Sequence, residues 1–182
     1  YQNSNWYDKK ISKVYNDNLS YKPSPHLLSS IVKYQKKKYK IDDFALESVW
    51  DNNINSKDFK KLNNFFWFFS LDLKSSKKTV QSLIVNWINN NHRFNKKSWD
   101  FDLTSKRVIS WLSNHELSYD DNNIKFKNKF NSSIQKQTNH LLNEIKNSKI
   151  FENKIIGCAA IILTGLSYQN NKIYIDNGLS FL

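Results

Sequence analysis

The chain has 182 residues, a formal net charge of +12, three glycines and two prolines. Folds built from strands need many tight turns, which rely on glycine and proline, so this composition disfavours an all-β fold. The single cysteine, Cys158, excludes an internal disulfide bond. We therefore expect residues 1–182 to form one all-α domain of sequential antiparallel helices, joined by short loops of Asn, Ser and Asp.

The first part of the chain, residues 1–55, carries the weakest pattern. A faint helical repeat within residues 1–22 is followed by a predicted helix over residues 26–38. Residues 40–56 have the composition of a loop that docks a few apolar side chains onto the body of the domain. This part is assigned to the domain mainly because it is continuous with the rest.

An aromatic run, FFWFF at residues 65–69, lies inside a helix predicted over residues 57–73 and preceded by Ser56. The run is apolar on every side of a helix, so neighbours on more than one face are expected to bury it. Stacking against sugar rings is the alternative use of these side chains. Core packing is the use that we expect.

The helix predicted over residues 76–91 has the clearest periodicity in the chain. Its apolar residues recur with the spacing i, i+3, i+4, i+7 and i+8, which places them on one face of a helix. These residues are Val80, Leu83, Ile84, Trp87 and Ile88.

Later segments alternate between amphipathic and wholly apolar helices, which favours a layered α/α array. The apolar run at residues 155–166 is too short to span a membrane and is expected to be a buried helix. The predicted helices cover residues 103–116, 124–147 and 151–168, with the start of another at 172–182. Thr104 or Asp102 is a suitable N-cap for the helix at 103–116.

Local motifs for common catalytic chemistry are missing from the sequence. It has no glycine-rich phosphate loop, no cysteine pair and no paired-histidine metal motif. The four histidines lie far apart, and the loop pairs Asp42–Asp43 and Asp120–Asp121 are typical of turns. We expect no metal and no cofactor.

One segment resembles a known family. The order Trp99-x4-Thr104-Ser105-x-Arg107-x3-Trp111 is similar to a segment in the N-terminal helical domain of heparinase II/III-like proteins. Arg107 is one of the two arginines in the chain. The Trp–Arg–Trp pattern is the most specific part of the resemblance.

Three other segments support the resemblance in the same order along the chain. Residues 64–73 resemble the aromatic helix that precedes the motif, and residues 82–91 resemble a helix that ends in an Asn-rich loop. Residues 157–166 resemble the alanine-rich buried helix that follows the motif. The resemblance therefore covers about residues 60–182.

The resemblance implies a fold and an activity. Members of the family have an N-terminal (α/α) toroid followed by a β-rich domain, so this chain would be part of an incomplete toroid. Characterised members are polysaccharide lyases that cleave uronic-acid-containing chains by β-elimination. The C5 proton of the sugar becomes acidic enough only when a donor screens the carboxylate, and a general base must lie within hydrogen-bond reach.

The chain departs from the family at the catalytic positions. Active lyases carry an Asn-His pair just before the alanine-rich helix, where this chain has Glu152-Asn153. The pair Asn139-His140 lies about one helical segment too early. It is our candidate for catalytic residues, but ordinary helix surface is the interpretation that we expect. The Tyr and the later His of the family would follow Leu182, so we expect the site to be incomplete and this piece to be inactive by itself.

Trp99, Arg107 and Trp111 have two interpretations. As substrate-binding residues they would stack on a sugar and contact its carboxylate or sulfate. As structural residues the tryptophans would anchor the core, and Arg107 would form a bidentate pair with Asp100 or Asp102. The structural interpretation is the one that we expect.

The lysine-rich charge is expected first of all to serve solubility, and enrichment in Lys, Asn, Ile and Tyr can reflect the base composition of the gene. The functional interpretation is affinity for an anionic partner. We expect that partner to be an acidic polysaccharide rather than nucleic acid, together with a C-terminal β-rich domain of the same protein. A non-catalytic module that binds polyanions, glycan or nucleic acid, is the alternative, and a helical scaffold for protein partners is the third. The chain lacks methionine and is expected to be a piece of a longer protein, periplasmic or cell-envelope-associated in a bacterium by the resemblance.

Overall fold

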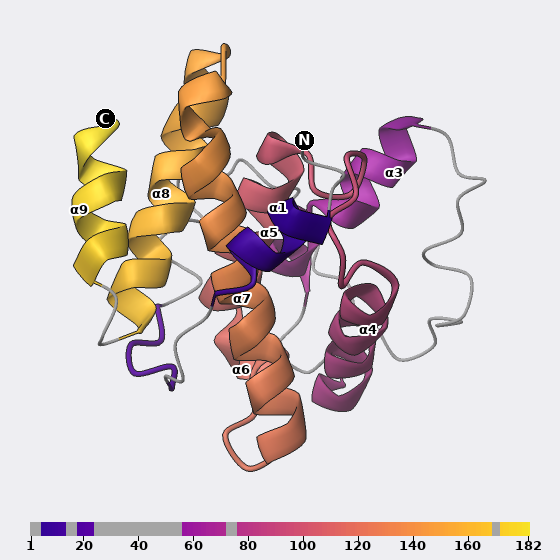
Figure 1. Ribbon diagram of the computed structural model, residues 1–182. Helices are drawn as coiled ribbons and strands as arrows, with labels where there is room; N and C mark the ends of the chain where they lie inside the picture. Colours follow the sequence, from indigo (N-terminus) through magenta and orange to yellow (C-terminus); the bar gives the residue numbers. More distant parts are fainter. Residues whose placement is uncertain (1–4, 14–17, 24–55, 72–75, 169–171) are drawn as a thin grey trace.

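The computed structural model describes residues 5–13, 18–23, 56–71, 76–168 and 172–182 (Figure 1). These residues form eight α-helices and two short 3₁₀ helices, η1 and η2, and a β-bridge joins Leu19 to Tyr168. The predicted all-α fold is thereby confirmed for this part of the chain, and the helix expected at 26–38 and the loop at 40–56 lie outside it. The elements are α1 (Asn5–Ile11), α3 (Ser56–Asn63), η1 (Phe66–Ser70), α4 (Lys77–Asn90), α5 (Phe101–Ser113), α6 (His115–Ser118), α7 (Ile124–Glu144), η2 (Ile145–Asn147), α8 (Phe151–Ser167) and α9 (Lys172–Ser180).

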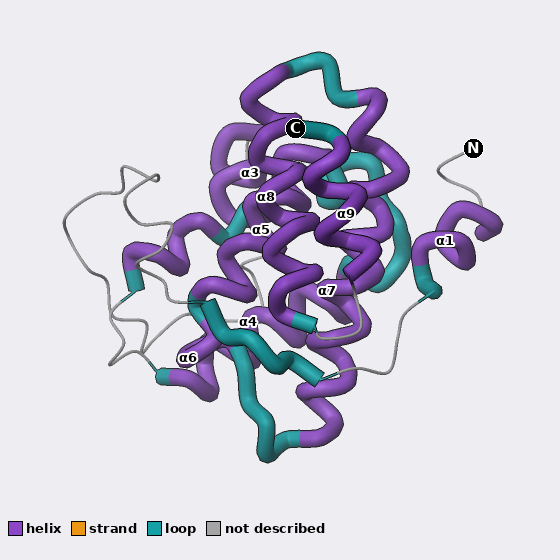
Figure 2. Tube along the Cα trace, turned by 90° about the vertical axis from the view of Figure 1, so that its left-hand side faces the viewer, coloured by secondary structure: helices purple, strands orange, loops and turns teal. Residues whose placement is uncertain are grey.

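Helix α5 lies at the centre of the fold, in contact with α3, η1, α6, α7 and α8 (Figure 2). It begins two residues before the predicted start, because Asp100 caps it. The side chain of Asp100 accepts hydrogen bonds from the backbone N–H groups of Asp102 and Leu103. The expected caps, Thr104 and Asp102, were therefore wrong: both residues lie within the helix.

The aromatic segment is two elements rather than the single helix predicted over 57–73. Helix α3 ends at Asn63, and η1 begins after Phe65, which has a left-handed backbone with φ of 56°. Asn64 stabilises the break, since its Oδ1 accepts a hydrogen bond of 2.9 Å from the N–H of Phe66. The turn redirects the chain so that Phe65 and Phe68 both reach the core.

Helix α4 confirms the clearest periodicity in the sequence. Ser76 caps it by accepting a hydrogen bond from the backbone N–H of Thr79. All five residues of the predicted apolar face are buried, namely Val80, Leu83, Ile84, Trp87 and Ile88. The opposite face of α4 is left for polar residues.

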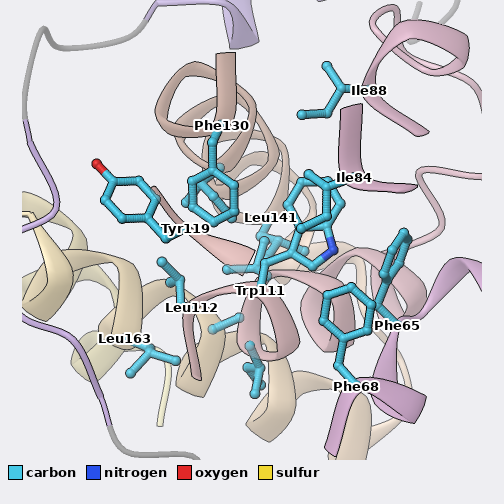
Figure 3. Packing of buried hydrophobic residues seen from close by; sticks show 14 of the residues in the cluster. Phe65, Phe68, Ile84, Ile88, Trp111, Leu112, Tyr119, Phe130, Leu141 and Leu163 are labelled. Carbon is cyan, nitrogen blue, oxygen red and sulfur yellow. The ribbon is translucent and has the colours of Figure 1, made fainter. Parts of the chain in front are cut away.

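An aromatic cluster joins η1, α4, α5 and α7. Its central residue is Trp111, which lies between Phe65 and Phe130 (Figure 3). The distance between ring centroids is 5.2 Å from Trp111 to Phe65, 5.6 Å to Trp87 and 5.8 Å to Phe130. The pairs with Phe65 and Trp87 are edge-to-face, and the pair with Phe130 is tilted. Aromatic pairs add stability beyond the buried area, so these four elements are expected to unfold together.

Helices α7, α8 and α9 begin and end close to the predicted positions. Helix α8 packs between α5 and α9, and α8 and α9 lie side by side (Figure 1). Glycines permit the close approach: Gly157 faces Phe101 of α5, and Gly165 faces Ile175 of α9. No helix in the described segments is both long and apolar enough to cross a bilayer. Closure of the helices into a toroid stays a prediction.

Gly165→Ala tests the contact between α8 and α9. A Cβ atom at this position would lie 2.9 Å from the backbone nitrogen of Ile175 and 2.6 Å from its Cγ1. Because backbone cannot move aside cheaply, we expect the free energy of unfolding to fall by about 2 kcal/mol, despite the better helix propensity of alanine. Urea denaturation measures the change, and the exposed position Glu152→Ala should shift stability by less than about 0.5 kcal/mol. An unchanged Gly165→Ala variant would contradict the close packing.

Candidate functional site

Arg107 is fully buried and connects three parts of the chain. Its Nε donates to Gln137 Oε1 of α7 at 2.6 Å, and its Nη1 donates to the backbone carbonyls of Asn63 at 2.8 Å and Ser98 at 3.0 Å. Its Nη2 donates to Thr104 Oγ1 within α5 at 3.1 Å. The planar fork thus fixes α3, the loop before α5, and α7 against α5.

The expected carboxylate partner of Arg107 is not found. Asp100 caps α5, and Asp102 forms an ion pair of 2.7 Å with Lys106. The guanidinium instead lies over the ring of Trp87, 3.9 Å from its centroid. Burial lowers the pKa of Arg107 well below its ordinary value, and the charge of Asp100 opposes this shift. Neutral oxygens and an aromatic face therefore stabilise the cation in place of an ion pair.

The two tryptophans of the motif are core residues in this structure. Trp99 is 2% exposed and Trp111 is fully buried. The indole N–H of Trp99 donates to the backbone carbonyl of Asn91 at 3.1 Å, which holds the loop between α4 and α5. The structure brings Trp99, Arg107 and Trp111 together in the interior, as the structural interpretation predicts, and of the three only Trp99 keeps a small exposed surface.

His140 is also buried, at 2% exposed, so it is not the helix surface that one interpretation of the sequence allowed. Its Nε2 lies 2.7 Å from the carbonyl of Trp99, and its Nδ1 lies 2.7 Å from the hydroxyl of Tyr7. A carbonyl can only accept, so Nε2 carries the proton, and the hydroxyl donates to Nδ1. Burial lowers the pKa of His140 to about 4, and the charge of Arg107 adds to the shift, against the bond to Trp99.

The side chain of Asn139 points in a different direction from that of His140, although both residues belong to α7. Its Nδ2 donates to the backbone carbonyls of Ile11 at 3.0 Å and Lys13 at 2.7 Å, and its Oδ1 accepts from the hydroxyl of Tyr174 at 2.8 Å. Consecutive helical residues point about 100° apart, so Asn139 and His140 bond to separate parts of the chain. Asn139 holds the end of α1 and helix α9, whereas His140 holds Tyr7 and Trp99.

A groove of about 620 Å³ lies between α4 and the first turns of α7. We call it the α4–α7 groove. Three lysines and several amide side chains line it, and its lining includes no carboxylate. The lining residues are Lys78, Gln81, Ser82, Val85, Asn86, Asn89, Asn90, Asn123, Lys125, Phe126 and Lys129.

The α4–α7 groove was not predicted, although two features of the sequence point to it. The polar residues of α4 recur at 78, 81, 82, 86, 89 and 90, which is the face opposite the buried apolar stripe. Residues 73–99 and 122–143 contain no Asp or Glu. The structure places parts of these two acid-free stretches face to face, so positive charge accumulates where they meet.

The side chains of the α4–α7 groove are partly ordered by one another. Lys129 Nζ donates to Asn89 Oδ1 at 2.5 Å, and Asn90 Nδ2 donates to Asn86 Oδ1 at 2.7 Å. Asn123 caps α7 by accepting from the N–H of Phe126 at 3.0 Å. The groove thus holds oriented amides, lysine ammonium groups and the positive end of a helix dipole, a combination that attracts anions.

Metal chemistry has no candidate in the described segments, which contain no group of three His, Cys, Asp or Glu side chains placed to hold an ion. The comparisons with known proteins found no family model, no curated protein and no solved structure that matches the chain. The function is therefore argued from the residues of the chain itself.

Proposed function

We propose that this chain is the helical portion of a heparinase II/III-like polysaccharide lyase, which cleaves uronic-acid-containing polysaccharide by β-elimination. The observation that carries the proposal is the segment Trp99-x4-Thr104-Ser105-x-Arg107-x3-Trp111. Its side chains organise the interior around α5, where a change of residue type would disturb several elements at once. A resemblance in such residues supports a shared fold, here part of an (α/α) toroid.

The chemistry of β-elimination requires two kinds of catalytic group. A donor must neutralise the uronate carboxylate, and a base must remove the C5 proton. Asn139 and His140 are engaged with the chain's own carbonyls and hydroxyls, so they support the fold in the state described here. We propose that the helical portion binds the acidic polysaccharide, and that a β-rich domain of the same protein supplies further catalytic groups.

The test of this proposal is product formation. The complete polypeptide that contains this chain is incubated with a panel of uronans that includes heparan sulfate and alginate. We expect unsaturated uronides to accumulate, because β-elimination leaves a double bond that absorbs in the ultraviolet. The 182-residue chain alone serves as a control and should release none. Absence of the product across the whole panel would contradict the lyase proposal.

A second function is favoured by the charge of the chain. The net charge of +12 and the acid-free lining of the α4–α7 groove would also suit a non-catalytic module that binds polyanions. Such a module would bind heparin and DNA alike, and added salt would weaken both steeply. Strong preference for one glycan at high salt would contradict this alternative.

A further inference from the structure

We infer that the α4–α7 groove is a binding site for a short stretch of acidic polysaccharide, with its lysines pairing the carboxylates or sulfates and its amides holding the sugar hydroxyls. The inference rests on the proposed function for the class of ligand, and it adds the site. The groove volume of about 620 Å³ is within the range of about 300–1,000 Å³ that small-ligand sites occupy. It would therefore take a few sugars of a longer chain.

The charge of the groove is not neutralised by ion pairs among the described residues. None of Lys78, Lys125 and Lys129 forms an ion pair with a described residue. Lys129 instead donates to the neutral amide of Asn89, which positions the ammonium group and leaves its charge uncompensated. Three uncompensated cations on facing helices attract a ligand with several anionic groups more strongly than a neutral one.

The start of α7 adds to this attraction. The helix is 21 residues long, and Asn123 and Lys125 at its first turn both line the groove. The side chain of Asn123 satisfies the N–H of Phe126, whereas backbone N–H groups earlier in the turn have no partner within the helix. The positive end of the helix dipole therefore acts together with the lysines.

The amides of the groove favour a sugar over a nucleic acid. Each Asn or Gln side chain both donates and accepts, as a sugar hydroxyl does. Gln81 Nε2, in the wall of the groove, has no hydrogen-bond partner among the described residues. Proteins that bind single-stranded nucleic acid present aromatic platforms for the bases, whereas the aromatic residue here, Phe126, is only 6% exposed. Val85 and the small exposed part of Phe126 supply apolar lining suited to the C–H face of a sugar ring.

The first experiment compares two triple variants of the 182-residue chain that change the net charge equally. The variant K78Q/K125Q/K129Q removes the groove lysines, and K77Q/K127Q/K149Q removes three lysines outside the lining. Calorimetric titration uses a heparin-derived hexasaccharide as the ligand and an uncharged hexasaccharide as the blank. We expect the groove variant to bind about tenfold more weakly, since each exposed pair contributes a few tenths of a kcal/mol or more. The control variant should lose less than about threefold.

The second experiment uses single substitutions that keep the shape of the side chain. Asn89→Asp would turn the contact with Lys129 into an ion pair and remove that charge from the ligand. We expect it to weaken hexasaccharide binding several-fold, whereas Asn128→Asp, an exposed position of α7 outside the lining, should have little effect. Far-ultraviolet circular dichroism confirms that every variant keeps its helices.

Three outcomes would overturn the inference. These are no binding of the hexasaccharide by the unmodified chain, equal weakening by the two triple variants, and DNA of matched charge binding at least as tightly with the same dependence on the groove lysines. Failure of the complete polypeptide to release unsaturated uronides, with groove binding intact, would reject the lyase and leave the binding site standing. If the complete polypeptide releases uronides and K78Q/K125Q/K129Q does not change that release, the lyase stands and the groove is rejected as its binding site.

Discussion

Replacement of Arg107 by alanine should lower the free energy of unfolding by about 4 kcal/mol, the largest effect expected of any single substitution in this chain. The change removes four hydrogen bonds and the contact with Trp87, and it leaves a cavity at the centre of the fold. The carbonyls of Asn63 and Ser98 and the amide of Gln137 would remain buried without this donor. A buried acceptor that loses its partner costs about 1–3 kcal/mol.

Two further variants distinguish the role of the planar guanidinium of Arg107 from that of its positive charge, and from the loss of any arginine. Arg107→Lys keeps a positive charge but cannot reproduce the planar fork, so we expect it to recover only part of the loss. Arg93→Ala, at the exposed arginine, is the control and should change stability by less than about 0.5 kcal/mol. Urea denaturation followed by far-ultraviolet circular dichroism measures all three. An Arg107→Ala variant as stable as the Arg93→Ala variant would show that Arg107 does not hold the elements together.

The second large effect is a loss of stability in acid through His140. The pKa of its side chain is about 4 in the folded protein, against an ordinary value of 6.5. The unfolded chain therefore takes up this proton below pH 6.5, whereas the folded chain takes it up only near pH 4. The contribution of this residue is fully present above pH 6.5 and is lost as the pH falls towards 4. The difference between the two pKa values corresponds to about 3 kcal/mol.

Urea denaturation at a series of pH values from neutral to about 4 tests this prediction. In the variant His140→Gln, stability should depend much less on pH over this range, whatever its stability at neutral pH. His92→Gln, at an exposed histidine, is the matched control and should keep the pH dependence of the unmodified chain. The same slope in His140→Gln as in the unmodified chain would contradict the assignment.

The helices that the sequence predicted well are those with a strong local signal. In α4 an apolar stripe and the capping residue Ser76 agree, and α8 is marked by its unbroken apolar run. The aromatic run at 65–69 carries no periodicity, because every residue is apolar, so the pattern could not reveal the break at Phe65. The break places Phe65 against Trp111, a tertiary contact that the local sequence does not reveal.

The candidate site was less accessible to sequence reasoning than the fold. Burial of Trp99 and Arg107 could be expected, but three of the four residues that accept hydrogen bonds from Arg107 are 9 to 44 positions away. The α4–α7 groove similarly joins residues such as Lys78 and Lys129 from different helices. The absence of acidic residues from both stretches was visible in the sequence. Only the packing of the helices shows which faces meet.

The attachment of α1 to α7 has a further consequence. A helix of seven residues does not persist in water by itself, so α1 depends on Tyr7, on the ion pair of 2.9 Å between Asp8 and Lys136, and on the amide of Asn139. Tyr7 covers the imidazole of His140, so detachment of α1 alone would admit water and a proton to that ring. We therefore expect local detachment of α1 to cost less free energy than global unfolding, and to be a route by which acid reaches His140.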